Sequence, residues 1–178
     1  MSGARTDIEA VEAANTALYD AVERGDIEAL SRLWLGEDAD DPDDPEGGEG
    51  EHGVRVVHPG WPVLTGRGEV LRSYALIMAN TEYVQFFLTD VEVSVLGNTA
   101  LVSCTENILS GGPAEEDGSA GPLVGGMVVA TNVFRRAEEG EWKLWSHHGS
   151  PILVEREDED EDGPGDGEGE LGQGDIEL

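Results

Sequence analysis

The stretch VRVVHPGWPVLTGRG, residues 54–68, brings together residue types that seldom occur side by side without a structural reason. Residues 54–57 alternate in the manner of a short strand. Pro59 and Gly60 then force a turn. The turn follows His58, whose side chain has an unperturbed pKa near neutrality, and precedes Trp61, a large ring with one hydrogen-bond donor. The stretch therefore predicts a strand that delivers a histidine and a tryptophan to the edge of a sheet.

The rest of the chain predicts helices first and long strands afterwards. A capping box at Thr6 opens a first helix that Gly25 closes, and Asp26 caps a second. The apolar spacing predicts a third helix over about 66–80 and strands over 84–96, 99–109, 124–136 and 141–153. The pair Gly125-Gly126 predicts a bulge or strong bend in its strand. This order predicts an α+β fold with one curved antiparallel sheet.

Three motifs stand in the order and spacing of a known family. They are His58-Pro-Gly-Trp-x-x-Leu-x-Gly-Arg67, Ala130-Thr-Asn-x-Phe134, and Trp142 followed by His147-His148-Gly-Ser-Pro151. With these motifs, residues 7–153 resemble the SnoaL-like branch of the nuclear transport factor 2-like superfamily. The resemblance implies a cone-shaped sheet with three N-terminal helices packed on its concave side. It does not choose an activity, because this superfamily includes isomerases, cyclases, dehydratases, hydrolases and non-catalytic binders.

Acidic residues dominate the composition. The net charge is −29, and Lys143 is the only lysine. Residues 37–51 hold nine acids and no base, and residues 154–178 hold twelve acids and one base. We therefore expect one domain over residues 1–153 that carries an acidic insertion at 37–51, followed by a disordered acidic tail. The excess of acids elsewhere in the chain is typical of a halophile, and it disfavours nucleic acid and anionic membranes as partners.

The single cysteine and the N-terminus bear on compartment and cofactors. Cys104 excludes an internal disulfide and a thiolate metal cluster, and its strand pattern predicts a buried, inert thiol. The N-terminus lacks the apolar segment of a signal peptide, so we expect a cytoplasmic protein. We expect no metal and no cofactor. A site built from His58, a later histidine and Glu106 is the one metal alternative.

The adjacent histidines His147 and His148 must point to opposite faces of a regular strand. Strict alternation puts His148 on the same face as Trp142 and Leu144, so we expect His148 to lie in the cavity with His58. If His58 and His148 lie on opposite sides of the sheet, His147 becomes the candidate.

Glu106 and Asn132 are polar residues within apolar strand faces. A desolvated carboxylate at Glu106 would have a raised pKa and exchange protons near neutrality. The alternative is an ion pair with Arg67 or Arg72. Asn132 needs hydrogen-bond partners if it is buried, and it would hold either a ligand carbonyl or a neighbouring histidine.

Tyr19 and Tyr74 lie on the predicted core faces of the first and third helices, where they either donate to a ligand or only pack. The full set of expected site residues has two parts. The catalytic candidates are His58, Glu106 and His148, and the ligand-binding candidates are Trp61, Tyr19, Tyr74 and Asn132.

Two functions fit these residues. One is a small-molecule binding protein with acid–base catalysis of the isomerase, cyclase or hydrolase type in an apolar cavity. The other is a non-catalytic dimeric binding or association module. Because Trp142 and Trp145 point to opposite faces and the helices cover only one, we expect a homodimer through the second face.

Overall fold

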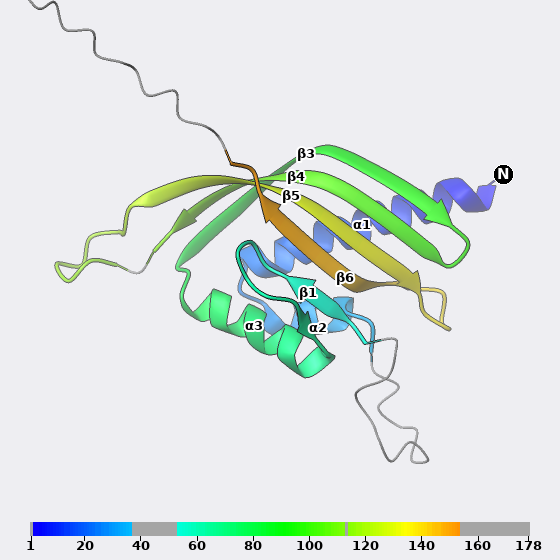
Figure 1. Ribbon diagram of the computed structural model, residues 1–178, viewed down its shortest axis with the longest axis horizontal. Helices are drawn as coiled ribbons and strands as arrows, with labels where there is room; N and C mark the ends of the chain where they lie inside the picture. Colours follow the sequence, from blue (N-terminus) through cyan, green and yellow to red (C-terminus); the bar gives the residue numbers. More distant parts are fainter. Residues whose placement is uncertain (1, 37–52, 113, 154–178) are drawn as a thin grey trace, which may run out of the picture.

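The computed structural model of the protein describes residues 2–36, 53–112 and 114–153 (Figure 1). The predicted acidic insertion at 37–51 and the predicted tail at 154–178 lie outside the described residues. Within the described part, the α+β prediction is confirmed: three helices accompany one curved, unclosed, mostly antiparallel sheet of six strands.

The helices follow the expected order. They are α1 (Ser2–Glu23), α2 (Ile27–Leu33) and α3 (Arg67–Ala79). Helix α1 begins one turn before Thr6, so the capping box does not mark its start. The chain leaves α1 through Gly25, whose φ of 61° suits a residue without a side chain, and the Asp26 carboxylate accepts the Ala29 N–H to cap α2.

The strands are β1 (Arg55–Val57), β2 (Leu64–Thr65), β3 (Tyr83–Leu96), β4 (Thr99–Gly111), β5 (Leu123–Arg136) and β6 (Trp142–Pro151). Their order across the sheet is β2-β1-β6-β5-β4-β3. The four long strands form an antiparallel meander, whereas β1 pairs with β6 in parallel. The parallel pairing brings the turn after β1 beside the end of β6, although the two are about ninety residues apart in the chain.

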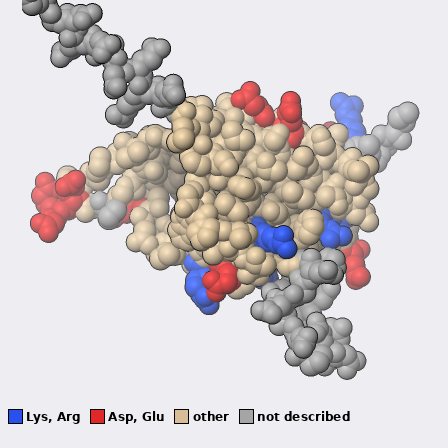
Figure 2. All heavy atoms as spheres, in the orientation of Figure 1, with Lys and Arg blue, Asp and Glu red and all other residues tan. Residues whose placement is uncertain are grey.

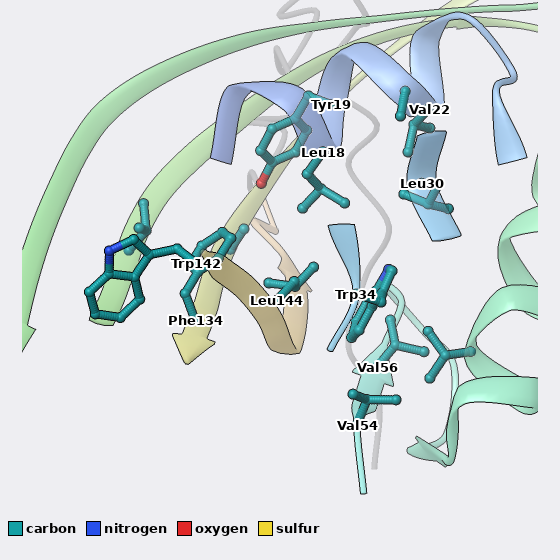
Figure 3. Close-up of a cluster of buried hydrophobic side chains, with 14 of the residues drawn as sticks. Leu18, Tyr19, Val22, Leu30, Trp34, Val54, Val56, Phe134, Trp142 and Leu144 are labelled. Atoms are coloured by element: carbon teal, nitrogen blue, oxygen red, sulfur yellow. The ribbon is translucent and has the colours of Figure 1, made fainter. Parts of the chain in front are cut away.

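The core lies between the helices and one face of the sheet, which we call the inner face. Helix α1 runs behind the strands in Figure 1. In Figure 3, Leu18 on this helix points toward Phe134 and Leu144 on the sheet, and all three are at most 2% exposed. Burial of each such side chain stabilises the fold by roughly 1.5–3 kcal/mol.

A β-bulge interrupts the pairing of β5 with β6. Val133 pairs with Ser146 and Phe134 pairs with Leu144, so Trp145 is the extra residue of the bulge, inserted between these two pairs. An extra residue changes the alternation of the strand by one position. Trp142 and Leu144 therefore face the core before the bulge, and His147 and Gly149 are the buried residues after it.

The bulge, one of the two forms predicted at Gly125 and Gly126, is wrong, because these residues pair in unbroken register with Leu109 and Ile108; the strong bend stays a prediction. The second irregularity of the sheet lies instead in β3. There the register shifts between Thr89 and Glu92, and Asp90 takes a φ of 52°. A bulge in an edge strand adds local twist and helps the sheet to curve.

The face of the sheet away from α1, the outer face, carries exposed apolar side chains. They come from three neighbouring strands and are Phe87, Leu101, Met127 and Val129, each more than 40% exposed. Figure 2 shows charged side chains scattered around a largely uncharged centre on the side of the molecule that faces the viewer. Among the described residues, no helix has the length and apolar character needed to span a membrane.

Candidate functional site

A cavity of about 250 Å³ lies between the helices and the inner face of the sheet. Its wall is mostly apolar and aromatic, with side chains from α1, α3, β3 and β4. The polar and titratable residues that line it are Tyr19, His58, Tyr74, Thr81, Glu106, Ser110 and His147. An apolar cavity with a few convergent polar groups is typical of a small-molecule site.

His58 reaches the cavity from the end of β1, where Gly60 makes the turn with a φ of 80°. The His58 side chain is buried, and its Nε2 lies 2.8 Å from Ser73 Oγ on α3. Its ring meets those of Trp61 and Tyr74 edge to face, with centroids 5.2 and 4.8 Å apart. Burial lowers the pKa of His58 to about 4, so the ring is neutral at physiological pH.

His147 enters the cavity from β6, directly opposite Asn132 on β5. Its Nδ1 lies 2.6 Å from Asn132 Oδ1. Burial, followed by the neighbouring His58 and His148 rings, lowers the pKa of His147 to about 3. The ring centroids of His147 and His58 are 6.4 Å apart, so two neutral imidazoles meet at one end of the cavity.

The placement of His148 in the cavity is wrong. His148 is exposed, whereas His147 is 6% exposed and lines the cavity. The error comes from the bulge at Trp145, because alternation counted from Trp142 fails at the extra residue. The two segments do converge, as the sequence predicted, but the histidine that meets His58 is His147.

A chain of buried hydrogen bonds connects His147 to Glu106. Asn132 Nδ2 donates to Asn15 Oδ1 at 2.8 Å and to the Tyr19 hydroxyl at 3.0 Å. The Tyr19 hydroxyl in turn donates to Glu106 Oε1 at 2.7 Å. We call these residues, Asn15, Tyr19, Glu106, Asn132 and His147, the polar chain. A buried polar network of this kind is stable only because each member has partners.

Glu106 is 3% exposed. Desolvation raises its pKa to about 6, although the hydrogen bond from Tyr19 lowers it. The carboxyl group therefore exchanges protons close to neutrality, as the sequence predicted. The suggested ion pairs with arginine are wrong. Arg67 donates to the backbone oxygens of Ser31, Trp34 and Leu35 at the end of α2, and Arg72 pairs with Glu69 on its own helix.

The aromatic candidates all line the cavity. Tyr19 and Tyr74 are each 5% exposed, whereas Trp61 is 37% exposed and reaches the surface. Burial first, and the nearby Glu106 second, raise the pKa of both tyrosines, so both hydroxyls stay protonated.

Cys104 is buried with a 3.6 Å contact to the Tyr19 hydroxyl, and burial raises its pKa, which agrees with an inert thiol. No group of three or more His, Cys, Asp or Glu side chains in the described ranges is placed to hold a metal ion.

A model of the SnoaL-like domain family matches residues 11–155, most of the chain. The chain belongs to the SnoaL-like domain family. A solved structure from Streptomyces avermitilis, provisionally named as a dehydratase of the nuclear transport factor 2-like family, is 66% identical. The match covers 84% of this chain and 99% of that one, with a TM-score of 0.73.

Two more distant relatives carry other names. A Novosphingobium aromaticivorans structure, provisionally named as an aromatic ring hydroxylase, is 18% identical over 84% of this chain and 91% of its own, with a TM-score of 0.64. F-box protein SKIP8 of Arabidopsis thaliana is 23% identical over 82% of this chain. This SnoaL-like chain spans about half the length of that curated relative, 51% of it.

Two residues of the site in this SnoaL-like protein were not among the sequence candidates. Asn15 lies on the core face of α1 and completes the polar chain, and Ser73 on α3 holds His58. Asn15 has a sequence signal, since it follows Val11 by four residues and precedes Leu18 by three on the same helical face. Ser73 has a weaker signal, one turn after the buried Val70.

Proposed function

We propose that this SnoaL-like protein binds an uncharged small molecule in its cavity and transfers protons to and from it. The observation that carries the proposal is the buried polar chain that runs from Glu106 to His147, with both end residues lining the cavity. A core that only needed to be packed would be more stable without a desolvated carboxylate and two desolvated imidazoles.

The two ends of the chain suit different roles. His147 Nδ1 donates to Asn132, so its Nε2 is the nitrogen left to accept a hydrogen bond from a ligand hydroxyl. Glu106, with a pKa of about 6, is the stronger base of the two, because the pKa of His147 is about 3. In an elimination of water, Glu106 takes a proton from a substrate carbon, the hydroxyl group held by His147 leaves, and the Glu106 carboxyl returns the proton to that group so that it departs as water.

The name of the Streptomyces relative favours this reaction class over the isomerase, cyclase and hydrolase types that the family also includes. That relative is 66% identical and aligns over 99% of its length. The cavity of about 250 Å³ is just below the roughly 300 Å³ at the lower end of pockets for drug-sized ligands, so we expect a substrate with one ring.

The test is a dehydration assay with a β-hydroxy ketone that carries one aromatic ring. Loss of water gives a conjugated enone with a new near-ultraviolet band. We expect turnover by the unmodified protein, a loss of at least about 100-fold in His147→Ala and in Glu106→Gln, and no change in the matched control His148→Ala. Binding without turnover in the unmodified protein would contradict the catalytic part and leave a binding protein.

The exposed outer face supports a second proposal, that two copies of the chain pair through it. Four large apolar side chains are more than 40% exposed there, which is unusual on the surface of a monomer. Trp145 is half-buried, and the guanidinium carbon of Arg135 lies 5.0 Å from the centroid of its ring. Trp142, in contrast, lies in the core. A non-catalytic association module would use this same face.

The charge of −29 opposes pairing at low ionic strength, and the acidic, lysine-poor composition suits the salt-rich cytoplasm of a halophile. We expect sedimentation to show a dimer in molar KCl and the thermal midpoint to rise with KCl. A monomer at every KCl concentration would contradict the pairing. A midpoint that does not change with KCl would contradict the halophilic and cytoplasmic assignment.

A further inference from the structure

The hydrogen bonds of the polar chain fix which nitrogen of each cavity histidine carries the hydrogen. Asn132 uses its amide N–H groups on Asn15 and Tyr19, so its Oδ1 faces His147 as an acceptor. The His147 hydrogen must then be on Nδ1. The remaining nitrogen, Nε2, carries a lone pair, and His147 lines the cavity.

His58 is fixed in the opposite tautomer with the same result. The Ser73 hydroxyl has one hydrogen, which it donates to the Val70 carbonyl at 2.7 Å. Ser73 Oγ therefore accepts from His58 Nε2, and Nδ1 carries the lone pair. Both histidines are thus acceptors on their free side, and within the described ranges neither free nitrogen has a recorded hydrogen-bond partner.

Two of the donors that the sequence suggested for a ligand oxygen are already used inside the protein. The Tyr19 hydroxyl donates to Glu106, and the Asn132 amide donates to Asn15 and Tyr19. No arginine or lysine lines the cavity among the described residues, and its one acidic group is Glu106. The histidine end of the cavity therefore offers no positive charge to a carboxylate, and its donors are the Tyr74 hydroxyl and the Trp61 N–H, whose rings flank His58.

We propose that the cavity selects an uncharged ligand with a hydroxyl group, and that this hydroxyl donates its hydrogen to Nε2 of His147 and lies beside His58. The proposal rests on the proposed function and adds the polarity of the ligand: a hydrogen-bond donor at the histidine end. A ligand that presents only a carbonyl or ether oxygen there would face two lone pairs and leave them unpaired, which costs affinity.

The first experiment compares four ring-sized probes at neutral pH by calorimetry or by NMR titration. They are para-ethylphenol, para-ethylanisole, ethylbenzene and the para-ethylbenzoate anion. We expect para-ethylphenol to bind about 3- to 10-fold more tightly than para-ethylanisole and ethylbenzene, which corresponds to one net hydrogen bond, and the anion to bind most weakly. Equal binding of the phenol and the anisole would overturn the proposal while leaving a small-molecule binding protein. Binding of none of the four would count against the proposed function as well.

The second experiment reads the tautomer directly and needs no ligand. In protein with nitrogen-15 in its histidines, we expect His147 to show a protonated Nδ1 and an unprotonated Nε2 at neutral pH, and Nε2 to shift on addition of para-ethylphenol. A protonated Nε2 would overturn the proposal. The variant His147→Ala should lose the preference for the phenol over the anisole, and the matched variant His148→Ala should keep it.

Discussion

His147 and His148 are neighbours in the chain, yet the protein places them in opposite environments. The first is 6% exposed, bonded to a buried amide and part of a cavity wall, whereas the second is exposed on the outer face. Burial lowers the pKa of His147 to about 3. The comparison shows that the chemistry of a histidine in this fold is set by the face of the sheet that it occupies. The faces themselves are set by one extra residue upstream.

The same contrast holds for the whole sheet. On the inner face the members of the polar chain, from Asn15 to Glu106, are buried and hydrogen-bonded to one another. On the outer face the polar and apolar side chains are mixed and exposed. Substitutions on the two faces should therefore differ in cost. Two pairs of variants test this difference, and a third pair compares a buried glycine with an exposed one.

The largest effect is expected at Asn132. The change Asn132→Ala leaves Asn15 Oδ1, the Tyr19 hydroxyl and His147 Nδ1 without their shared partner. Because each buried group that loses its hydrogen bond costs about 1–3 kcal/mol, the free energy of unfolding should fall by about 3 kcal/mol or more. Thr131, the neighbour of Asn132 on the outer face, provides the control. The change Thr131→Ala should alter the free energy of unfolding by less than about 0.5 kcal/mol. Denaturant unfolding measures both, and similar losses would mean that the faces are not energetically distinct.

A smaller effect is expected in acid. The pKa of His147 is about 3 in the folded protein and 6.5 ordinarily, so its contribution to stability is complete above pH 6.5 and is lost as the pH falls toward 3. Glu106 acts in the opposite direction, since its folded pKa of about 6 lies above 4.5 and its contribution is lost as the pH rises through 6.

The variant His147→Gln removes the histidine contribution while its amide can still donate to Asn132. When the pH is lowered from 6.5 to 4.5, the free energy of unfolding of this variant should fall by about 2 kcal/mol less than that of the unmodified protein. His148→Gln should follow the unmodified curve. Urea titrations at a series of pH values measure the slopes, and parallel slopes for all three proteins would show that His147 titrates normally in the fold.

The smallest effect is expected at Gly149. A Cβ at this position would lie 3.1 Å from Val128 Cγ1 and 3.2 Å from the Pro59 ring, so Gly149→Ala should cost about 1 kcal/mol. Gly126 in β5 has no atom within 4 Å of such a Cβ, and Gly126→Ala should be neutral or slightly stabilising. Thermal midpoints compare the two, and a stable Gly149→Ala would mean that the turn after His58 adjusts freely.

The sequence predicts most of this fold because its helices and strands have regular apolar spacing and clear turns. Gly97, for example, makes the β3–β4 turn with a φ of 59°, between the strands predicted over 84–96 and 99–109. The bulge could not be predicted, since Leu144, Trp145 and Ser146 are ordinary strand residues and none of them marks an irregularity. For the same reason the cavity histidine was misassigned.

The site was only partly predictable for a different reason. Each of Tyr19, Glu106 and Asn132 stood out as a polar group on an apolar face, but the contacts between them join residues 87 and 113 positions apart. Sequence spacing carries no information on such contacts once the strands curve. The three residues come together in one buried network, but their contacts required coordinates: two of the expected ligand donors donate to the protein itself.

The extra residue Trp145 also separates β6 into two halves that can vary independently. Residues before it, such as Leu144, belong to the hydrophobic core, and residues after it, such as His147, belong to the cavity. Loss of that one residue alone would remove the bulge and keep His147 opposite Asn132, because the pairs on either side would then follow in regular alternation. Loss of the next residue as well would put His148 where His147 now lies. A two-residue deletion here is therefore a short mutational route by which a related protein could acquire a different cavity wall while keeping the same core.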